Sequence, residues 1–187
     1  MIKLAMTLNK TPIDLVVAET KPLSEILYED FGINLSRVNC NGRCCGGCLV
    51  LVESIPVLGC MYPAFKLQGK TITTFDAFML TSHYRNIKRT YDSLGLTPCP
   101  DCYEPKTLII ESILLRNQIK RGNNIDSLDP NSRNFMEKKV LTNQFDDIDE
   151  QTIADEFSLS ACKCMDPSDL LLIVKKARED RIKRHVR

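Results

Sequence analysis

The stretch CNGRCCGGC, residues 40–48, places four cysteines and three glycines within one short segment. Cys40, Cys45 and Cys48 follow the spacing C-x4-C-x2-C, and Cys60 comes after a further eleven residues. This is the plant-type spacing of ligands to a [2Fe–2S] cluster. Glycine allows a loop to approach a cluster closely with positive φ angles. The segment therefore predicts a cluster-binding loop, with Gly42, Gly46 and Gly47 at the points of close approach.

Two other interpretations apply to the same cysteines. They are small apolar side chains that pack in a core, or they are thiolate ligands of zinc. Structural zinc usually takes two C-x2-4-C knuckles, whereas this stretch supplies a single one. Cys44 replaces Cys45 as a ligand if the loop shifts by one residue, but the spacing favours Cys45.

A second set of cysteines lies further along the chain, in the pattern C-x2-C followed by C-x-C. Its members are Cys99, Cys102, Cys162 and Cys164, and each pair comes just before a predicted helix. The partial positive charge of two helix N-termini would stabilise an anionic thiolate cluster. A pair of zinc knuckles and unliganded redox cysteines remain alternatives for this set.

The residues around the first set predict a compact β-grasp-like order. Alternating apolar residues predict a strand from Ile2 to Leu8, and Asn9-Lys10 predicts a turn. The remaining elements are a strand over 13–18, a helix over 22–30 ended by Gly32, strands over 49–53 and 55–58, and a short strand over 70–74.

The second half of the chain predicts helices. Their expected positions are about 83–94 (ended by Gly95), 104–117, 149–159, and from Asp166 to the C-terminus, with Pro167 in the first turn. The polar segment 118–148 predicts a surface loop or insertion, with or without a short helix over 134–141. The fold class is therefore α+β: a β-grasp [2Fe–2S] domain over 1–75, followed by an all-α four-helix domain over 76–187.

The amino-acid composition limits the classes of function and partner that are expected. Lys and Arg number 25 against 24 Asp and Glu, and Trp is absent, so nucleic acid and membrane surfaces are not expected partners. No apolar run reaches the length of a membrane span, and the N-terminus has no signal-peptide pattern. Nine cysteines form an odd set, which indicates metal or redox chemistry in a reducing cytoplasm rather than disulfides.

The two cysteine sets together resemble the iron–sulfur subunit of the molybdenum hydroxylases, the family of xanthine dehydrogenase, aldehyde oxidoreductase and carbon monoxide dehydrogenase. The resemblance covers nearly the whole chain. It includes the segments PLSEIL at 22–27, CLVLVE at 48–53, KTITT at 70–74 and SLSACKC at 158–164, together with Cys60.

The resemblance implies two [2Fe–2S] clusters and a role in electron transfer. Electrons would pass from a molybdopterin-bound metal in a large subunit to FAD in another subunit. It implies that the cluster nearer molybdenum is held by Cys99, Cys102, Cys162 and Cys164. It implies that the cluster nearer flavin is held by Cys40, Cys45, Cys48 and Cys60.

The sequence departs from the family pattern at positions where members of the family contact their partner subunit. Pro98 stands where the family has a Gln that contacts the pterin, and Pro100-Asp101 replaces Gly-Phe. Met165-Asp166 follows the last cysteine in place of Thr-Gly, and Arg43 replaces a common Gly. The separation between Cys102 and Cys162 is also roughly twice that of the family.

The expected role is that of a non-catalytic subunit of an oxidoreductase. The chain has two histidines, so histidine-based catalysis is not expected, and His83 is predicted to be packed or solvated. The basic end, 175–187, is predicted to be a solvated helix face. A two-cluster carrier for a different flavin dehydrogenase and a zinc-stabilised interaction module are the alternative functions.

Overall fold

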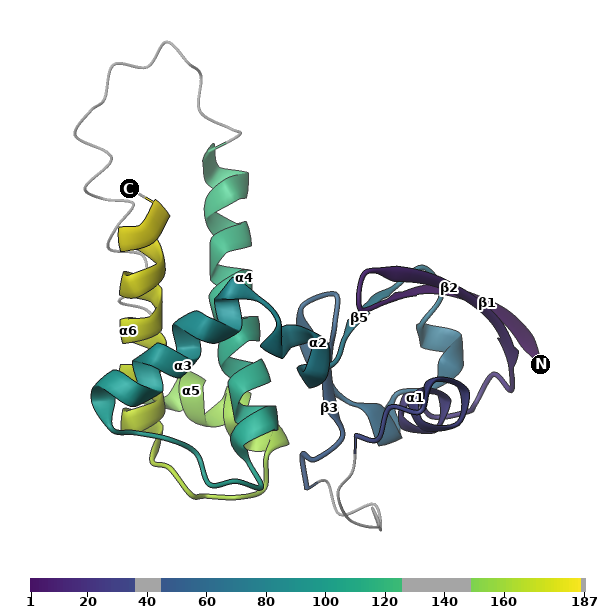
Figure 1. Ribbon diagram of the computed structural model, residues 1–187, viewed down its shortest axis with the longest axis horizontal. Helices are drawn as coiled ribbons and strands as arrows, with labels where there is room; N and C mark the ends of the chain where they lie inside the picture. The colour runs from purple at the N-terminus through teal and green to yellow at the C-terminus, as the bar shows by residue number, and fades with distance from the viewer. Residues whose placement is uncertain (36–44, 126–148, 186–187) are drawn as a thin grey trace.

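A computed structural model describes the backbone of residues 1–35, 45–125 and 149–185. In this structure a curved sheet wraps around helix α1 at one end of the molecule, and the longer helices pack together at the other (Figure 1). Strand β3 and helix α2 lie between the two parts. The predicted mixture of a small sheet and helices is confirmed.

The sheet contains five strands in the order β2-β1-β5-β3-β4. Their bounds are β1 Ile2–Leu8, β2 Thr11–Val17, β3 Leu49–Val52, β4 Ile55–Leu58 and β5 Thr71–Thr73. β1 and β2 form an antiparallel hairpin, and β5 runs parallel to β1. Asn9 and Lys10 have φ angles of 51° and 73°, the left-handed conformation that a two-residue hairpin turn requires. The predicted turn is therefore confirmed.

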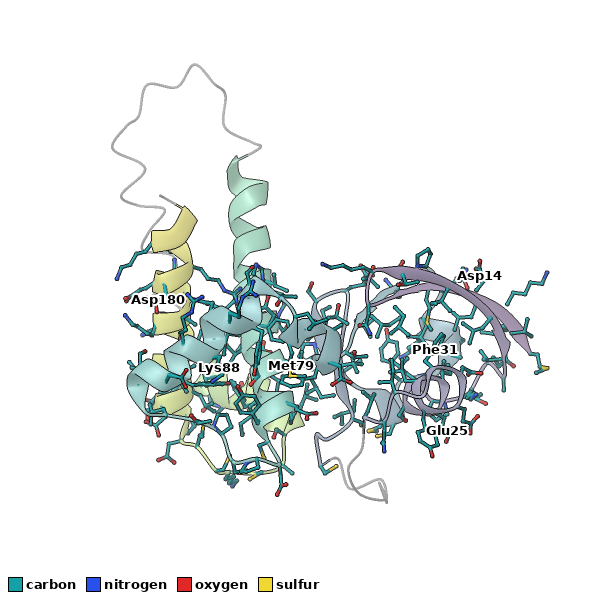
Figure 2. The ribbon with its side chains drawn as sticks, in the orientation of Figure 1. Asp14, Glu25, Phe31, Met79, Lys88 and Asp180 are labelled. Atoms are coloured by element: carbon teal, nitrogen blue, oxygen red, sulfur yellow. The ribbon has the colours of Figure 1, made fainter. Side chains whose placement is uncertain are left out.

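Helix α1, Leu23–Phe31, buries Leu23, Ile26 and Leu27 against the sheet. Gly32 ends it with a φ of 67° and donates its N–H to the carbonyl groups of the last turn, as the sequence predicted. Phe31 packs at the edge of this core, beneath the curved strands (Figure 2).

Strand β3 is buried on both faces because it contributes to two cores. Val50 and Val52 pack with α1 and β1, whereas Leu49 and Leu51 pack with the helices. Helix α4, Tyr103–Ile125, contacts both β3 and β4. The Ser112 hydroxyl of α4 also donates to the Ser54 carbonyl oxygen, at 2.7 Å. The helical part is thus attached to the sheet through the strand that follows the first cysteine loop.

The other helices surround α4. They are α2 Phe75–Met79, α3 Ser82–Leu94, α5 Glu150–Glu156 with the 3-10 turn η4 Phe157–Leu159, and α6 Pro167–His185. Thr81 caps α3 by accepting the Tyr84 N–H, and Gly95 ends it at a φ of 66°. Within the described ranges, no helix combines the length and apolar character that crossing a bilayer requires.

Three expectations need correction, and one element, helix α2, was not predicted. Helix α4 continues to Ile125, so residues 118–125 are helical rather than part of a loop, while 126–148 lie outside the described residues. The expected helix over 149–159 divides into α5 and η4. Arg181, expected on a solvated face, is 6% exposed because it pairs with the buried Glu111 of α4.

Candidate metal centre

The structure brings together the four cysteines of the second set, here called the helical site: Cys99, Cys102, Cys162 and Cys164. Their Sγ atoms all lie within 4.8 Å of one another, and those of Cys99 and Cys162 are 3.9 Å apart. Two segments far apart in the sequence therefore converge, as the spacing predicted. Four converging thiols form a set that a tetrahedral zinc ion or an iron–sulfur cluster both accept.

Local backbone structure positions this site. The Cys102 N–H donates to the Cys99 carbonyl oxygen at 2.9 Å, which closes the tight turn between the first pair. The Cys102 carbonyl then accepts the Lys106 N–H at 3.0 Å, at the start of α4. On the other side, α6 begins at Pro167, shortly after Cys164. Both cysteine pairs thus precede helix N-termini, where the partial positive charge favours thiolates.

The four thiols differ in exposure and in acidity. Cys102 is 4% exposed, Cys99 is half-buried, and Cys162 and Cys164 are exposed. Burial raises the pKa of the Cys102 thiol, and its contacts with Cys162 and Cys99 raise it further. A hydrogen bond from Cys102 lowers the pKa of Cys99, while burial raises the pKa of Cys164. A metal centre must therefore displace protons from this site on binding.

The first set is here called the sheet site: Cys40, Cys45, Cys48 and Cys60. Cys40, together with its neighbour Cys44, lies outside the described residues. Cys48 is 2% exposed, Cys60 is half-buried and Cys45 is exposed. The Gly59 N–H donates to the Cys48 carbonyl oxygen at 3.0 Å, which holds the residue before Cys60 against Cys48. The β3–β4 hairpin thus holds the residue before Cys60 next to Cys48, but among the described residues only the helical-site thiols gather within 4.8 Å of one another.

Gly46 has the positive φ expected of a cluster-binding loop. Its φ is 89°, and its carbonyl oxygen accepts the Leu49 N–H at 3.1 Å. A residue with a side chain is strained in this conformation. Gly47 lies beside Cys45, since a Cβ built on it would be 3.7 Å from the Cys45 Sγ atom.

A buried polar network lies apart from the cysteines and was not found from the sequence. Glu111 of α4 is 2% exposed; its carboxylate accepts from Arg181 of α6 and lies 2.7 Å from Nδ1 of His83 on α3. Arg181 Nε also donates to the Asn86 side-chain oxygen at 3.0 Å. His83, whose side chain is 40% exposed, therefore lies at the outer end of a polar network that joins three helices.

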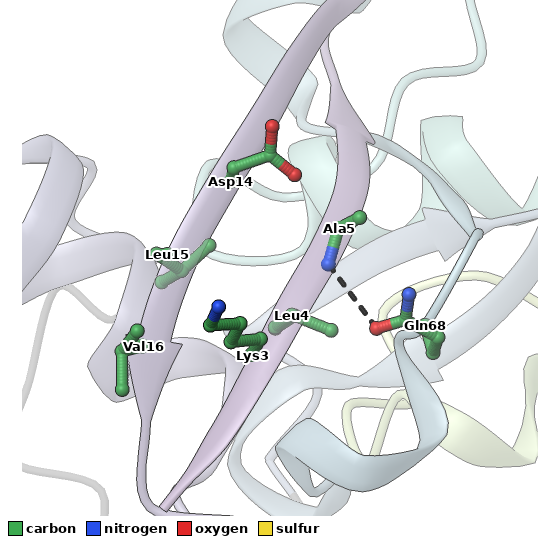
Figure 3. A pocket seen from close by; sticks show the side chains of 7 residues that line it. All are labelled: Lys3, Leu4, Ala5, Asp14, Leu15, Val16 and Gln68. Atoms are coloured by element: carbon green, nitrogen blue, oxygen red, sulfur yellow. Dashed lines mark hydrogen bonds between the residues drawn. The ribbon is translucent and has the colours of Figure 1, made fainter.

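A shallow hollow of about 370 Å³ lies on strands β1 and β2 (Figure 3). The Ala5 N–H donates to the Gln68 Oε1 atom at 3.1 Å on its border. Its lining contains Lys3 and Asp14 as charged groups and no cysteine. The hollow has no ligand set comparable to the four thiols of the helical site.

Proteins of similar sequence include iron–sulfur subunits of dehydrogenases. No protein-family model matches the chain. The xanthine dehydrogenase iron-sulfur-binding subunit of Escherichia coli O157:H7 is 30% identical over 101 residues, which span 54% of this chain and 63% of that subunit. A nicotinate dehydrogenase subunit of Pseudomonas putida is 19% identical over 96% of this chain and 97% of its own length. The nicotinate dehydrogenase small FeS subunit of Eubacterium barkeri is 25% identical over 62% of this chain and 74% of its own length.

Solved structures share the fold. Quinoline 2-oxidoreductase from Pseudomonas putida 86 contains a chain that matches with a TM-score of 0.64 at 17% identity, covering 98% of this chain and 96% of its own. Aldehyde oxidoreductase from Desulfovibrio gigas matches with a TM-score of 0.67 at 19% identity, covering 98% of this chain and 18% of its own. The resemblance of this chain to the iron–sulfur subunits of the molybdenum hydroxylase family, predicted from its cysteines, is thereby confirmed.

Proposed function

We propose that the chain is a non-catalytic electron-transfer subunit that holds two [2Fe–2S] clusters. In this proposal, residues 1–75 form a β-grasp ferredoxin-like domain and residues 76–187 form an all-α domain, with one cluster in each. The convergence of the four helical-site thiols within 4.8 Å is the observation that carries the proposal. The similarity to iron–sulfur subunits of xanthine and nicotinate dehydrogenases supports it.

The chemistry of the donors fits such clusters. A [2Fe–2S] centre held by four thiolates accepts and releases one electron at a potential set by its surroundings. Cys45, Cys48, Cys99, Cys102, Cys162 and Cys164 are thiols rather than disulfides, which agrees with ligands in a reducing cytoplasm. In the helical site, Cys102 is the buried member of the set, at 4% exposed. Cys162 and Cys164 hold their side of the site at the protein surface, open to a partner.

The proposed partners are a molybdopterin-containing large subunit, next to the helical site, and an FAD-containing subunit, next to the sheet site. Position 98, where the family has a Gln, carries a buried proline that has no N–H to offer a pterin. Asp101 lies beside Cys102 and is exposed. Asp101 is therefore the proposed polar contact from this chain to the partner's cofactor.

Metal analysis of the purified chain tests this proposal. Two [2Fe–2S] clusters require about four iron atoms and about four acid-labile sulfides per chain. The cluster-loaded chain should also absorb visible light and give two signals in electron paramagnetic resonance after reduction. Stoichiometric zinc with little iron would contradict the proposal and favour a zinc-stabilised interaction module. Co-purification with a flavin dehydrogenase that lacks molybdenum would instead favour the separate two-cluster carrier.

A further inference from the structure

Lys106 is a buried cation in the helical part of the molecule. It lies in the first turn of α4 and is 2% exposed. Leu108, Ile109 and Ile110, which follow it, are 0% exposed, so α4 is buried on all sides here. None of the ion pairs among the described residues includes Lys106. An ammonium group in a core is unfavourable unless a negative charge lies near it.

Lys106 is close to the helical site on the side of the first cysteine pair. Its backbone N–H donates to the Cys102 carbonyl oxygen at 3.0 Å, which places the two residues one helical turn apart. Residues four apart lie on the same face of a helix. Helical side chains also lean toward the N-terminus of their helix, and Cys102 lies at that end of α4.

The same side chain contacts the segment that leads to the second cysteine pair. The Lys106 Nζ atom lies 5.3 Å from the centroid of the Phe157 ring, within the range of a cation–π contact. Phe157 is 5% exposed, and its carbonyl oxygen accepts the Ser160 N–H at 3.0 Å, two residues before Cys162. Lys106 therefore contacts both chain segments that supply the four thiols. The ring attracts the ammonium but is neutral, so it does not cancel the charge.

We propose that Lys106 is the buried counter-ion of the metal centre in the helical site, and that its charge raises the reduction potential of the cluster held there. Four thiolates make such a centre anionic, and this supplies the negative charge that the core otherwise lacks near Lys106. A reduced cluster carries one more negative charge than the oxidised cluster. The ammonium stabilises the reduced form more, which raises the potential. The effect on the potential rests on the proposed function, whereas the charge balance requires only that the four thiols bind a metal.

A redox titration followed by electron paramagnetic resonance tests the effect on the potential. Lys106→Met keeps the length of the side chain but removes its charge, and it should shift the midpoint potential of the helical-site cluster to a lower value. Lys106→Arg keeps the charge and should keep most of the potential. Lys88→Met is the matched control, because it removes one positive charge from a lysine whose side chain is 54% exposed, and it should leave the potential unchanged. Loss of one signal in Cys99→Ser identifies the helical-site cluster. Full iron content with an unchanged potential in Lys106→Met would overturn the inference.

Cobalt binding tests the charge balance without iron. Co²⁺ bound by thiolates absorbs visible light, and the absorption lost in Cys99→Ser belongs to the helical site. In the metal-free chain, Lys106→Met should weaken cobalt binding at this site by about tenfold or more, and Lys88→Met should not. The metal-free Lys106→Met chain should also melt at a higher temperature, because a buried charge without a counter-ion has been removed.

Equal cobalt affinity in Lys106→Met and the unsubstituted chain would overturn the inference. A metal-free Lys106→Met chain that melts at a lower temperature or fails to fold would also overturn it, since the lysine would then be needed for the fold itself. Iron analysis of the unsubstituted chain, done first, detects failure of the proposed function, and the cobalt titration still tests the counter-ion in that case.

Discussion

Cys44 and Cys45 are adjacent cysteines with different expected roles. Four residues separate Cys40 from Cys45, and two separate Cys45 from Cys48. This spacing assigns the ligand role to Cys45. Cys45→Ser should therefore abolish the sheet-site cluster, seen as loss of one of the two paramagnetic signals and of about half of the iron. Cys44→Ser is the neighbouring control and should retain both signals. The opposite result would show that the loop is shifted by one residue.

Glu111 is the central residue of the buried network between helices. Substituting it with Gln keeps its size but leaves the Arg181 guanidinium buried without its counter-ion. Breaking a buried ion pair in this way costs about 3–5 kcal/mol. We expect Glu111→Gln to lower the free energy of unfolding by an amount of this order, measured by urea denaturation with circular dichroism. Lys88→Gln, which removes an exposed pair with Asp92, should change stability by less than about 1 kcal/mol. Equal effects of the two variants would show that the network does not stabilise the helices.

Thr81 determines where helix α3 begins. Its hydroxyl oxygen accepts the Tyr84 N–H at 3.2 Å, which satisfies one of the free donors of the first turn. Thr81→Ala should lower the free energy of unfolding by about 1 kcal/mol, whereas Thr81→Ser, which preserves the cap, should retain most of it. Thermal unfolding of the cluster-loaded chain would measure the difference. Equal losses in the two variants would indicate that the methyl group, rather than the cap, is responsible.

Elements with local signals were predictable from the sequence, and those set by tertiary contacts were not. Gly32 and Gly95 end α1 and α3 because only residues tolerant of a positive φ fit there, and a glycine at such a position can be recognised from the sequence. Helix α2 is five residues long and is positioned by burial of Phe75 and Phe78 in the helical core. No periodic pattern in the sequence predicts so short a helix. Burial of Arg181 likewise depends on a carboxylate seventy residues away.

The same distinction applies to the candidate sites. The spacing of Cys99, Cys102, Cys162 and Cys164 was sufficient to predict their convergence, because ligands of one centre must meet whatever the intervening chain does. The close approach of Gly46 to Ser160, where a Cβ built on Gly46 would lie 3.1 Å from the Ser160 Cα, was not predictable, since it depends on how the sheet packs against the helices. The assignment of the sheet-site ligands stays a prediction.

Across the molecule, the thiols differ in their access to solvent, which gives a prediction for the cluster-free chain. Cys45, Cys162 and Cys164 are exposed, whereas Cys48 and Cys102 are 2% and 4% exposed. After removal of metal by a chelator, iodoacetamide should modify the exposed thiols first and the two buried thiols last. The raised pKa of Cys102 further slows its reaction, because the thiolate is the nucleophile. Mass spectrometry of a time course gives the order, and early modification of Cys102 would mean that the helical site opens without its metal.

Strand β3 belongs to both cores, and this limits how the chain can be divided. A fragment ending at residue 75 would keep β3 but would expose Leu49 and Leu51, which the helices cover in the full chain. An exposed apolar face of this kind promotes self-association. The amide protons of β3 should therefore exchange with solvent only when both halves open together, so the two cysteine sites share one cooperative folding unit. Proteins that insert the clusters would then act on one cooperatively folded chain rather than on two independently folded domains.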